Sequence, residues 1–152
     1  VWTGREVLQR VFKHLDGREP ATILTKLVVN KFKVTGPEKL AQKIYKENFL
    51  ESISFLSILA DLAARKGDVS ARSILRRAGE EAAMSAEAVI KKLGLFKQEF
   101  PLVLSGSMFE SDNFTRAVKL YIKQTAPNAK FIKPEEEPVL GAVKIAIENL
   151  KK

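Results

Sequence analysis

The sequence has 152 residues, enough for one compact domain with a buried core, and 45% of them are apolar while 29% are charged. This balance is typical of a globular protein in water, and no apolar run approaches the roughly 20 residues that a membrane-spanning helix needs. The absence of cysteine excludes disulfides, thiolate metal sites and cysteine-held clusters. No signal-peptide pattern follows Val1, so we expect a cytoplasmic protein, and the lack of a starting methionine indicates a piece of a longer chain.

The net charge of +8 raises the question of nucleic-acid binding. Lysine and arginine are spread over nearly every predicted helix and alternate with glutamate and aspartate, and the basic clusters are only pairs. Nucleic-acid readers combine a concentrated basic face with base-stacking aromatic residues or a helix-turn-helix, and neither is found here. Nucleic acid is therefore a disfavoured partner, and a basic helical interaction or nucleic-acid-binding module remains the alternative function.

The first two thirds of the sequence predict helices throughout. Apolar residues recur at helical spacing over residues 4–15, 20–32, 37–48, 54–66 and 69–93. Thr3 and Glu6 have the spacing of a capping box, Ser52 or Ser54 is expected to cap the fourth helix, and Asp68 is expected to cap the fifth. Residues 1–97 are thus predicted to form a helical layer.

Several catalytic schemes lack their residues. His14 is the only histidine, and its place beside Lys13 on the polar side of the first helix indicates a solvated residue, so a histidine triad or zinc site is not expected. The phosphate-binding patterns GxxxxGK[ST] and GxGxxG are both absent. No pair of carboxylates stands out as an acid and base.

The pattern changes at Phe100. The apolar run Leu102–Leu104 is too short for a helix and predicts a strand covered on both faces, and Ser105-Gly106-Ser107 then forms a small-residue turn. Ser111 and Asp112 offer an N-cap for a helix over residues 112–124. A strand, a glycine turn and a helix can face a ligand, since glycine lets it approach the backbone, but an ordinary connection fits the same pattern.

The remaining residues predict a second strand over 129–133 and a helix over 138–150. The acidic residues 135–137 are interpreted as an N-terminal cap of that helix rather than a metal site. The side chains expected to be buried on this helix are Leu140, Val143, Ala146, Ile147 and Leu150. Residues 98–152 are therefore predicted as strand, helix, strand, helix, in a mainly helical α/β fold.

The whole chain resembles the C-terminal part of the N-acetylglucosamine kinases of the BadF/BadG/BcrA/BcrD ATPase family. The resemblance rests on four blocks in the family's order: Trp2 to Val7, Ala64 to Asp68 with Ile74 to Glu80, Pro101 to Ser111, and Glu137 to Ala142. It implies part of a lobe of the actin and sugar-kinase (ribonuclease H-like) ATPase fold. The pair Gly106-Ser107 resembles the kinase branch, since many of the ATPases have two glycines there, and the lack of cysteine disfavours the iron–sulfur activator branch.

The resemblance also implies where ATP would bind. Gly106 and Ser107 match the adenosine motif, with Met108 next to the nucleoside. Ser111, Ser54 and Gly141 align with further nucleotide-side positions.

The family's phosphate loops, its catalytic aspartate and its sugar-binding residues correspond to segments before Val1. Phosphoryl transfer needs the phosphates, metal and acceptor held together, so we expect the chain alone to be inactive. The expected partners are the upstream half of the parent chain, ATP (with Mg in the full-length protein) and, through an exposed strand edge, a second copy.

Overall fold

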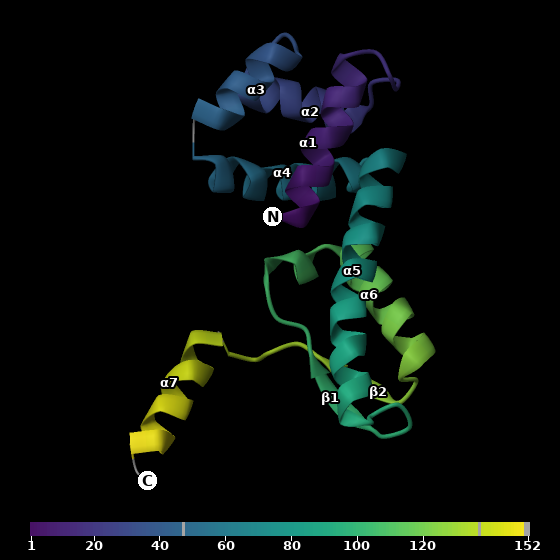
Figure 1. Ribbon diagram of the computed structural model, residues 1–152, viewed down its shortest axis with the longest axis vertical. Coiled ribbons are helices and arrows are strands. Elements are labelled where there is room, and N and C mark those ends of the chain that lie inside the picture. The colour runs from purple at the N-terminus through teal and green to yellow at the C-terminus, as the bar shows by residue number, and fades with distance from the viewer. Residues whose placement is uncertain (47, 137, 151–152) are drawn as a thin grey trace. The chain divides into compact units, whose positions relative to one another are not determined.

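The structure, a computed structural model, describes residues 1–46, 48–136 and 138–150 and is mainly helical with one small parallel sheet, as the sequence predicted (Figure 1). The chain divides into two units, Val1–Ala82 and Ala83–Lys152. No helix among the described residues is both long enough and apolar enough to span a membrane. This mainly helical fold with its parallel strands is consistent with part of a sugar-kinase-like ATPase lobe.

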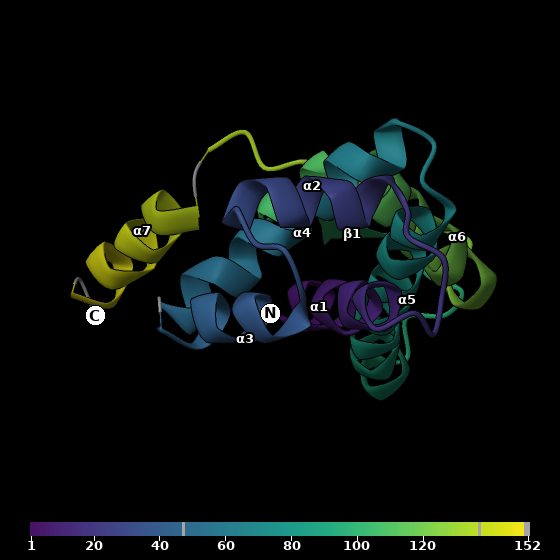
Figure 2. The same ribbon diagram turned by 90° about the horizontal axis from the view of Figure 1, so that it is seen from above.

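The first unit is built around one helix, α4. Its elements are α1 (Trp2–Leu15), α2 (Ile23–Phe32), α3 (Pro37–Lys46), α4 (Phe49–Arg65) and the beginning of α5 (Val69–Leu93), which continues into the second unit. α4 contacts α1, α2 and α3, and two views show α2 and α4 side by side (Figures 1 and 2). A helix with three helical neighbours must be apolar on more than one side, which explains its composition.

The buried stripe of α4 differs from the one that its sequence suggests. Ile53, Leu56 and Ala60 are fully buried, whereas Ile58 is 62% exposed and Leu62 is 40% exposed. Because most positions of this helix are apolar, periodicity alone does not decide which face is covered. The positions of its three neighbouring helices decide it.

The prediction that Ser52 or Ser54 caps α4 is wrong. The helix begins earlier, at Phe49, and the side chain of Asn48 accepts a hydrogen bond from the backbone N–H of Glu51 at 3.4 Å. Asparagine is as good an N-cap as serine, and it comes first along the chain. The hydroxyl of Ser54 instead donates to the carbonyl of Leu50 at 2.8 Å, inside the helix.

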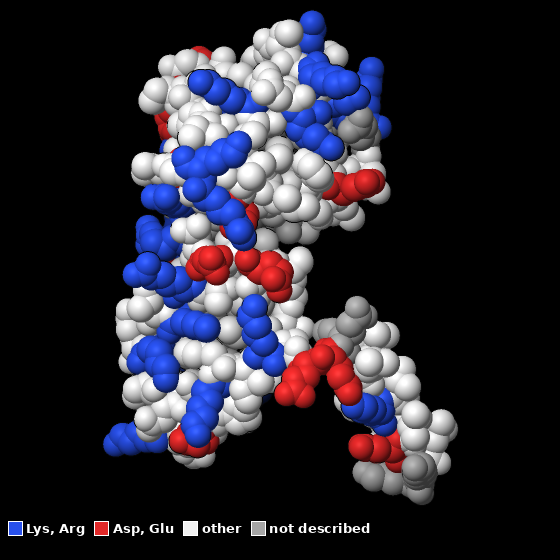
Figure 3. Space-filling view, turned by 180° about the vertical axis from the view of Figure 1, so that it is seen from behind, with Lys and Arg blue, Asp and Glu red and all other residues white. Residues whose placement is uncertain are grey.

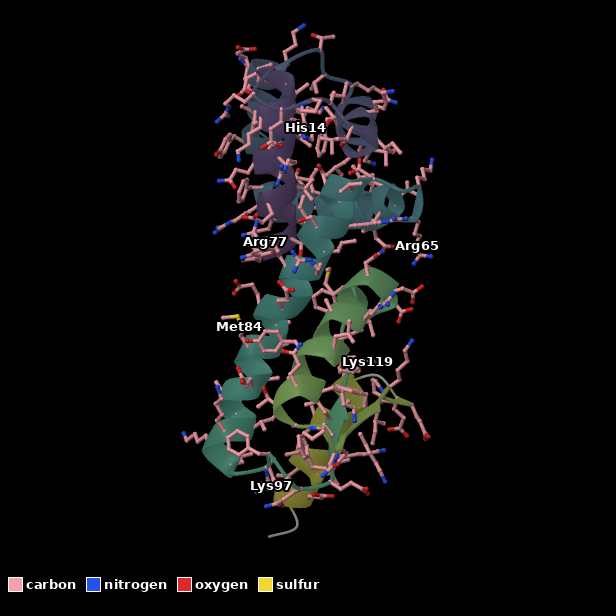
Figure 4. All side chains as sticks on the ribbon, turned by 90° about the vertical axis from the view of Figure 1, so that its right-hand side faces the viewer. His14, Arg65, Arg77, Met84, Lys97 and Lys119 are labelled. Atoms are coloured by element: carbon pink, nitrogen blue, oxygen red, sulfur yellow. The ribbon has the colours of Figure 1, made fainter. Side chains whose placement is uncertain are left out.

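Two other helix starts also differ from their predictions. α1 begins at Trp2 without a side-chain cap, and Thr3 is buried within its first turn, so the capping box is wrong. Glu6 pairs instead with Arg77 of α5 at 3.0 Å, and Arg77 lies against α1 (Figure 4). α2 begins at Ile23, three residues after Pro20. At α1 a tertiary contact of Glu6 replaces the local cap, whereas α2 begins where the N–H of Thr22 donates to the hydroxyl of Thr25 at 3.2 Å.

Asp68 caps two helices at once. Its carboxylate accepts the N–H of Ala71 in α5 at 2.9 Å, as predicted, and also the N–H of Leu24 in α2 at 2.7 Å. Burial raises the pKa of Asp68, but these backbone donors outweigh burial and hold the pKa below its ordinary value. The ionised carboxylate therefore stabilises the start of both helices.

His14 is buried, so the prediction of a solvated histidine is wrong. Its Nδ1 forms a hydrogen bond with the hydroxyl of Thr25, and its Nε2 lies 3.6 Å from the carboxylate of Glu19 (Figure 4). Burial lowers the pKa of His14, although Glu19 partly opposes this. A neutral imidazole can accept at one nitrogen and donate at the other, so it fits between α1 and α2.

Gly4 marks the closest approach of α1 to α4. A Cβ atom at this position would lie 2.0 Å from the carbonyl oxygen of Ile53 and 2.7 Å from its Cγ2 atom. Only a residue without a side chain allows the two helices to pack at this distance.

The second unit contains a two-stranded parallel sheet and the helices that follow its strands. Its elements after α5 are β1 (Phe100–Val103), the short 3-10 helix η1 (Ser107–Glu110), α6 (Asp112–Thr125), β2 (Ala129–Ile132) and α7 (Pro138–Leu150). Phe100 lies opposite Ala129, and Val103 lies opposite Ile132. β1 begins two residues before the predicted strand, and Val103 is 55% exposed, so the strand is not covered on both faces.

α6 supports this sheet. Its residues Phe114, Val118 and Ile122 recur at helical spacing and are buried. The hydroxyl of Thr125 donates to the carboxylate of Glu87 in α5 at 2.7 Å, which joins α6 to the part of α5 in this unit. The crossover helix of a parallel strand pair must be amphipathic, and α6 has this pattern.

α7 is helical as predicted, but its expected burial is wrong. Leu140, Val143, Ala146, Ile147 and Leu150 are all exposed, Leu150 at 87%. Periodicity shows that these residues share a face of the helix, but burial also needs a surface to pack against. The described part of the chain does not cover this face.

Replacing Gly4 by alanine should destabilise the protein. The new Cβ would overlap the Ile53 carbonyl, so we expect the free energy of unfolding to fall by about 2 to 3 kcal/mol in urea denaturation. Gly141→Ala is the matched control, because its Cβ would have nothing within 4 Å and alanine favours a helix. Equal stability of G4A and the unchanged protein would contradict the close approach.

Replacing Asp68 by asparagine should lower the free energy of unfolding by about 1 to 3 kcal/mol at neutral pH. The amide N–H₂ group would face a backbone donor that the carboxylate now satisfies. The pKa of Asp68 is lowered on folding, so its contribution is present above the unfolded value of about 3.9 and is lost as pH falls through the lower folded value. The stability difference should therefore shrink below about pH 4. The control is Asp16→Asn, which removes an exposed ion pair with Arg18 and should change the free energy of unfolding little. A stability loss in D68N that does not depend on pH would exclude this role of the carboxylate.

Candidate functional site

The carboxyl ends of β1 and β2 lie at the same edge of the sheet. The N–H of Leu104 donates to the carbonyl of Ile132 at 2.8 Å, so the pairing continues to the last residues of both strands. Residues 105–110 follow β1, and residues 133–136 follow β2. In parallel α/β sheets this edge is where ligands bind, because the connecting segments end there side by side.

These two segments enclose a hollow of about 500 Å³, which we call the strand-end hollow. Its lining residues are Leu104, Ser105, Gly106, Ser107, Phe109, Glu110, Lys133, Pro134, Glu135 and Glu136. Most of these side chains are exposed, and Leu104 is the buried residue among them. The hollow is therefore open to a ligand from solvent.

Gly106 has a backbone conformation that other residues avoid. Its φ is 116° and its ψ is 154°, in a region that is almost restricted to glycine. A Cβ atom built on it would meet nothing within 4 Å. Glycine is needed here for the turn itself, and the lack of a side chain leaves the backbone accessible from the hollow.

The turn after Gly106 is fixed to α6 by several contacts. The N–H of Phe109 donates to the carbonyl of Gly106 at 3.0 Å, and the hydroxyl of Thr115 donates to the carbonyl of Phe109 at 2.9 Å. The rings of Phe109 and Phe114 meet edge to face, with centroids 5.2 Å apart. The exposed residues Gly106 and Ser107 are thus presented by a well-anchored loop.

The charge of the strand-end hollow is mainly negative. Glu110, Glu135 and Glu136 line it together with a single cation, Lys133, and Glu136 also pairs with Lys144 at 2.6 Å. Carboxylates accept hydrogen bonds from hydroxyl and amino groups but repel phosphates. The lining therefore suits an uncharged polar ligand better than a polyanion.

The residues predicted for nucleotide binding fall into two sets. Gly106 and Ser107 line the strand-end hollow. Met108 and Ser111 belong to the same loop without lining the hollow, and Ser111 is buried with its hydroxyl accepting the N–H of Phe114 at 3.5 Å. The role of Ser111 in the structure is the N-cap of α6, as its position ahead of the helix predicted.

The remaining two predicted residues lie outside this loop. Ser54 is in the middle of α4, in the first unit, where its hydroxyl is bonded to the Leu50 carbonyl. Gly141 is in the exposed helix α7, with open space at its Cα. Their assignment to a nucleotide site stays a prediction.

Sequence analysis missed the second wall of the hollow. Lys133, Glu135 and Glu136 line it, whereas the acidic residues were interpreted only as a helix cap, and Glu137 lies outside the described residues. The sequence did predict two strands with a helix between them, and two parallel strands joined in this way bring their carboxyl ends together. The segment after the second strand could therefore have been predicted to lie beside Gly106. Among residues 1–46, 48–136 and 138–150, no cluster of three or more acidic or histidine side chains is arranged to hold a metal.

Comparison with known proteins identifies the family of the chain. Residues 1–146 match the BadF/BadG/BcrA/BcrD ATPase family. The chain is 32% identical to the N-acetyl-D-glucosamine kinase of Dictyostelium discoideum, an alignment that covers 97% of this chain and 48% of that protein. It is 26% identical to the N-acetylmuramic acid/N-acetylglucosamine kinase of Clostridium acetobutylicum, over 94% of this chain and 47% of that protein. The chain spans about half the length of these relatives, and the match over nearly all of its residues shows that it belongs to the BadF/BadG/BcrA/BcrD ATPase family.

Proposed function

We propose that this chain is the nucleotide-binding C-terminal part of an ATP-dependent amino-sugar kinase, and that the strand-end hollow receives the adenosine end of ATP. The observation that carries the proposal is Gly106, whose accessible backbone lies at the carboxyl edge of a parallel sheet. Family membership supports the use of ATP, and both named relatives are kinases of N-acetylated amino sugars.

The residues of the hollow fit a nucleoside. Its volume of about 500 Å³ is within the usual range of small-molecule sites, about 300 to 1,000 Å³. Ribose hydroxyls and the adenine amino group can donate to the carboxylates of Glu110 or Glu135, while the backbone at Gly106 allows the flat base to approach closely. The triphosphate is disfavoured by the same carboxylates, so it would extend away from this lining.

ATP, with its magnesium ion, would supply the phosphoryl group for transfer to the sugar. In this proposal Gly106 and Ser107 bind and orient the nucleoside, and the loop that carries them is held in place by α6 through Thr115. The phosphate, metal and sugar groups would be handled by the other half of a full-length protein. An isolated chain would then bind nucleoside without completing phosphoryl transfer.

Adenosine should bind at residues 104–110 and 133–136. A ¹H–¹⁵N NMR titration would locate the binding site from the amide signals that shift. The variant Gly106→Ala should weaken binding by about tenfold or more, because a Cβ would project from the backbone that the base approaches. At residues 104–110 and 133–136, ATP should bind no more tightly than adenosine, since the carboxylates there repel phosphates.

Gly94→Ala is the matched control. Gly94 also has a positive φ, of 68°, and open space at its Cα, but it does not line the hollow. G94A should leave adenosine affinity unchanged, and thermal unfolding would verify that both variants remain folded. Equal weakening by both variants, or shifts confined to other residues, would contradict the proposed site.

The chain alone should not show N-acetylglucosamine-dependent ATP hydrolysis. Transfer needs the phosphates, metal and acceptor in one arrangement, and the chain spans only about half the length of its kinase relatives. A coupled assay of ADP release with and without the sugar measures this directly. Turnover that depends on the sugar would show that the chain carries a complete active site.

A further inference from the structure

A second hollow, of about 700 Å³, lies between α2 and α3 in the first unit. Its lining residues are Lys31, Phe32, Lys33, Val34, Lys39, Gln42, Lys43 and Lys46. We call it the lysine hollow, because five of these residues are lysine and none is acidic. Figure 3 shows basic side chains on the face of the first unit that is turned away from the viewer in Figure 1.

The lysines converge because of helix geometry. Lys39, Gln42, Lys43 and Lys46 are spaced at i, i+3, i+4 and i+7 and therefore share one face of α3. Seven residues of helix span about 10 Å, so Lys39 and Lys46 stand at the two ends of this face. Lys31 and Lys33, at the end of α2, complete the ring around the hollow.

Most of this charge is not neutralised by the chain. No salt bridge within the described residues involves Lys31, Lys33, Lys39 or Lys46. The ammonium group of Lys31 lies over the ring of Phe55, 4.1 Å from its centroid. Four lysines elsewhere have acidic partners, namely Lys13, Lys91, Lys130 and Lys144. Others, such as Lys92 and Lys97, form no salt bridge with the described residues either, so what distinguishes the lysine hollow is that its lysines lie together. Like charges within about 10 Å repel one another, so a bound anion would relieve the repulsion among Lys31, Lys33, Lys39 and Lys46, which form no salt bridge with the described residues.

Lys33 provides an independent indication. It ends α2 in the left-handed conformation, with φ 52° and ψ 47°, and it is the one non-glycine residue in the described ranges with positive φ. Glycine is the residue that adopts this helix-ending conformation with least strain. A lysine at this helix end accepts strain that glycine would avoid, and the turn places Lys33 in the lining of the hollow.

We propose that the lysine hollow binds a small anion that carries several linked phosphate groups. Lysine ammonium groups donate to phosphate oxygens, and the lining of the hollow includes lysines from α3 and from the end of α2. The volume suits a small molecule. A nucleic acid is disfavoured because the aromatic residue of the lining, Phe32, is only 7% exposed and offers no ring for a base to stack on.

The test uses inorganic tripolyphosphate, which has no nucleoside, and isothermal titration calorimetry at about 50 mM salt, where surface charges are only partly screened. The double variant Lys39→Gln/Lys46→Gln should weaken binding by about tenfold or more. Lys92→Gln/Lys97→Gln removes the same charge from exposed positions outside the hollow and should change affinity less than about twofold.

Lys33→Gly separates binding from folding. Glycine relieves the left-handed strain, so the thermal midpoint should stay the same or rise while tripolyphosphate affinity falls by about threefold or more. Amide shifts of the unchanged protein should map to residues 31–46.

Three results would overturn the proposal. The first is equal weakening by the two double variants, which would mean a general charge effect. The second is shifts at residues 104–110, which would place the anion in the strand-end hollow. The third is binding of single-stranded polynucleotide without binding of tripolyphosphate, which would indicate a nucleic-acid surface.

Discussion

Asp68 joins three helices of the first unit. It accepts backbone N–H groups at the beginning of α2 and α5, and the N–H of Asp68 itself donates to the carbonyl of Ala63 near the end of α4 at 3.0 Å. The first N–H groups of any helix lack partners within the helix, and burying them unpaired would cost free energy. One ionised side chain, 4% exposed, satisfies two such ends, so the position of α2 beside the beginning of α5 depends on it.

The second unit depends on a different constraint, the parallel pairing of two short strands. A parallel pair requires a crossover, which α6 provides, and it places both strand ends at one edge. Gly106 then opens the first connection, and the loop is held by hydrogen bonds and by the contact between Phe109 and Phe114. The strand-end hollow is a consequence of this topology rather than of any single motif.

The two hollows differ in charge, and this difference decides their chemistry. The strand-end hollow has three glutamates and one lysine, whereas the lysine hollow has five lysines and no acid. Carboxylates favour the hydroxyl and amino groups of a nucleoside, and ammonium groups favour phosphates. A sugar kinase needs both kinds of recognition, but our proposal for the lysine hollow is independent of the kinase reaction and is tested with a probe that lacks a nucleoside.

The sequence by itself determined the helical elements, the cap at Asp68, the cap at Ser111 and the strand, glycine turn and helix around Gly106, because these depend on residues close together in the chain. It did not reveal the burial of His14, the exposure of α7, the contact of Gly4 with Ile53 or the second wall of the strand-end hollow. Each of those depends on segments that are distant in sequence. Only the tertiary structure decides which surfaces meet, because periodicity identifies a face of an element but not the element that covers it.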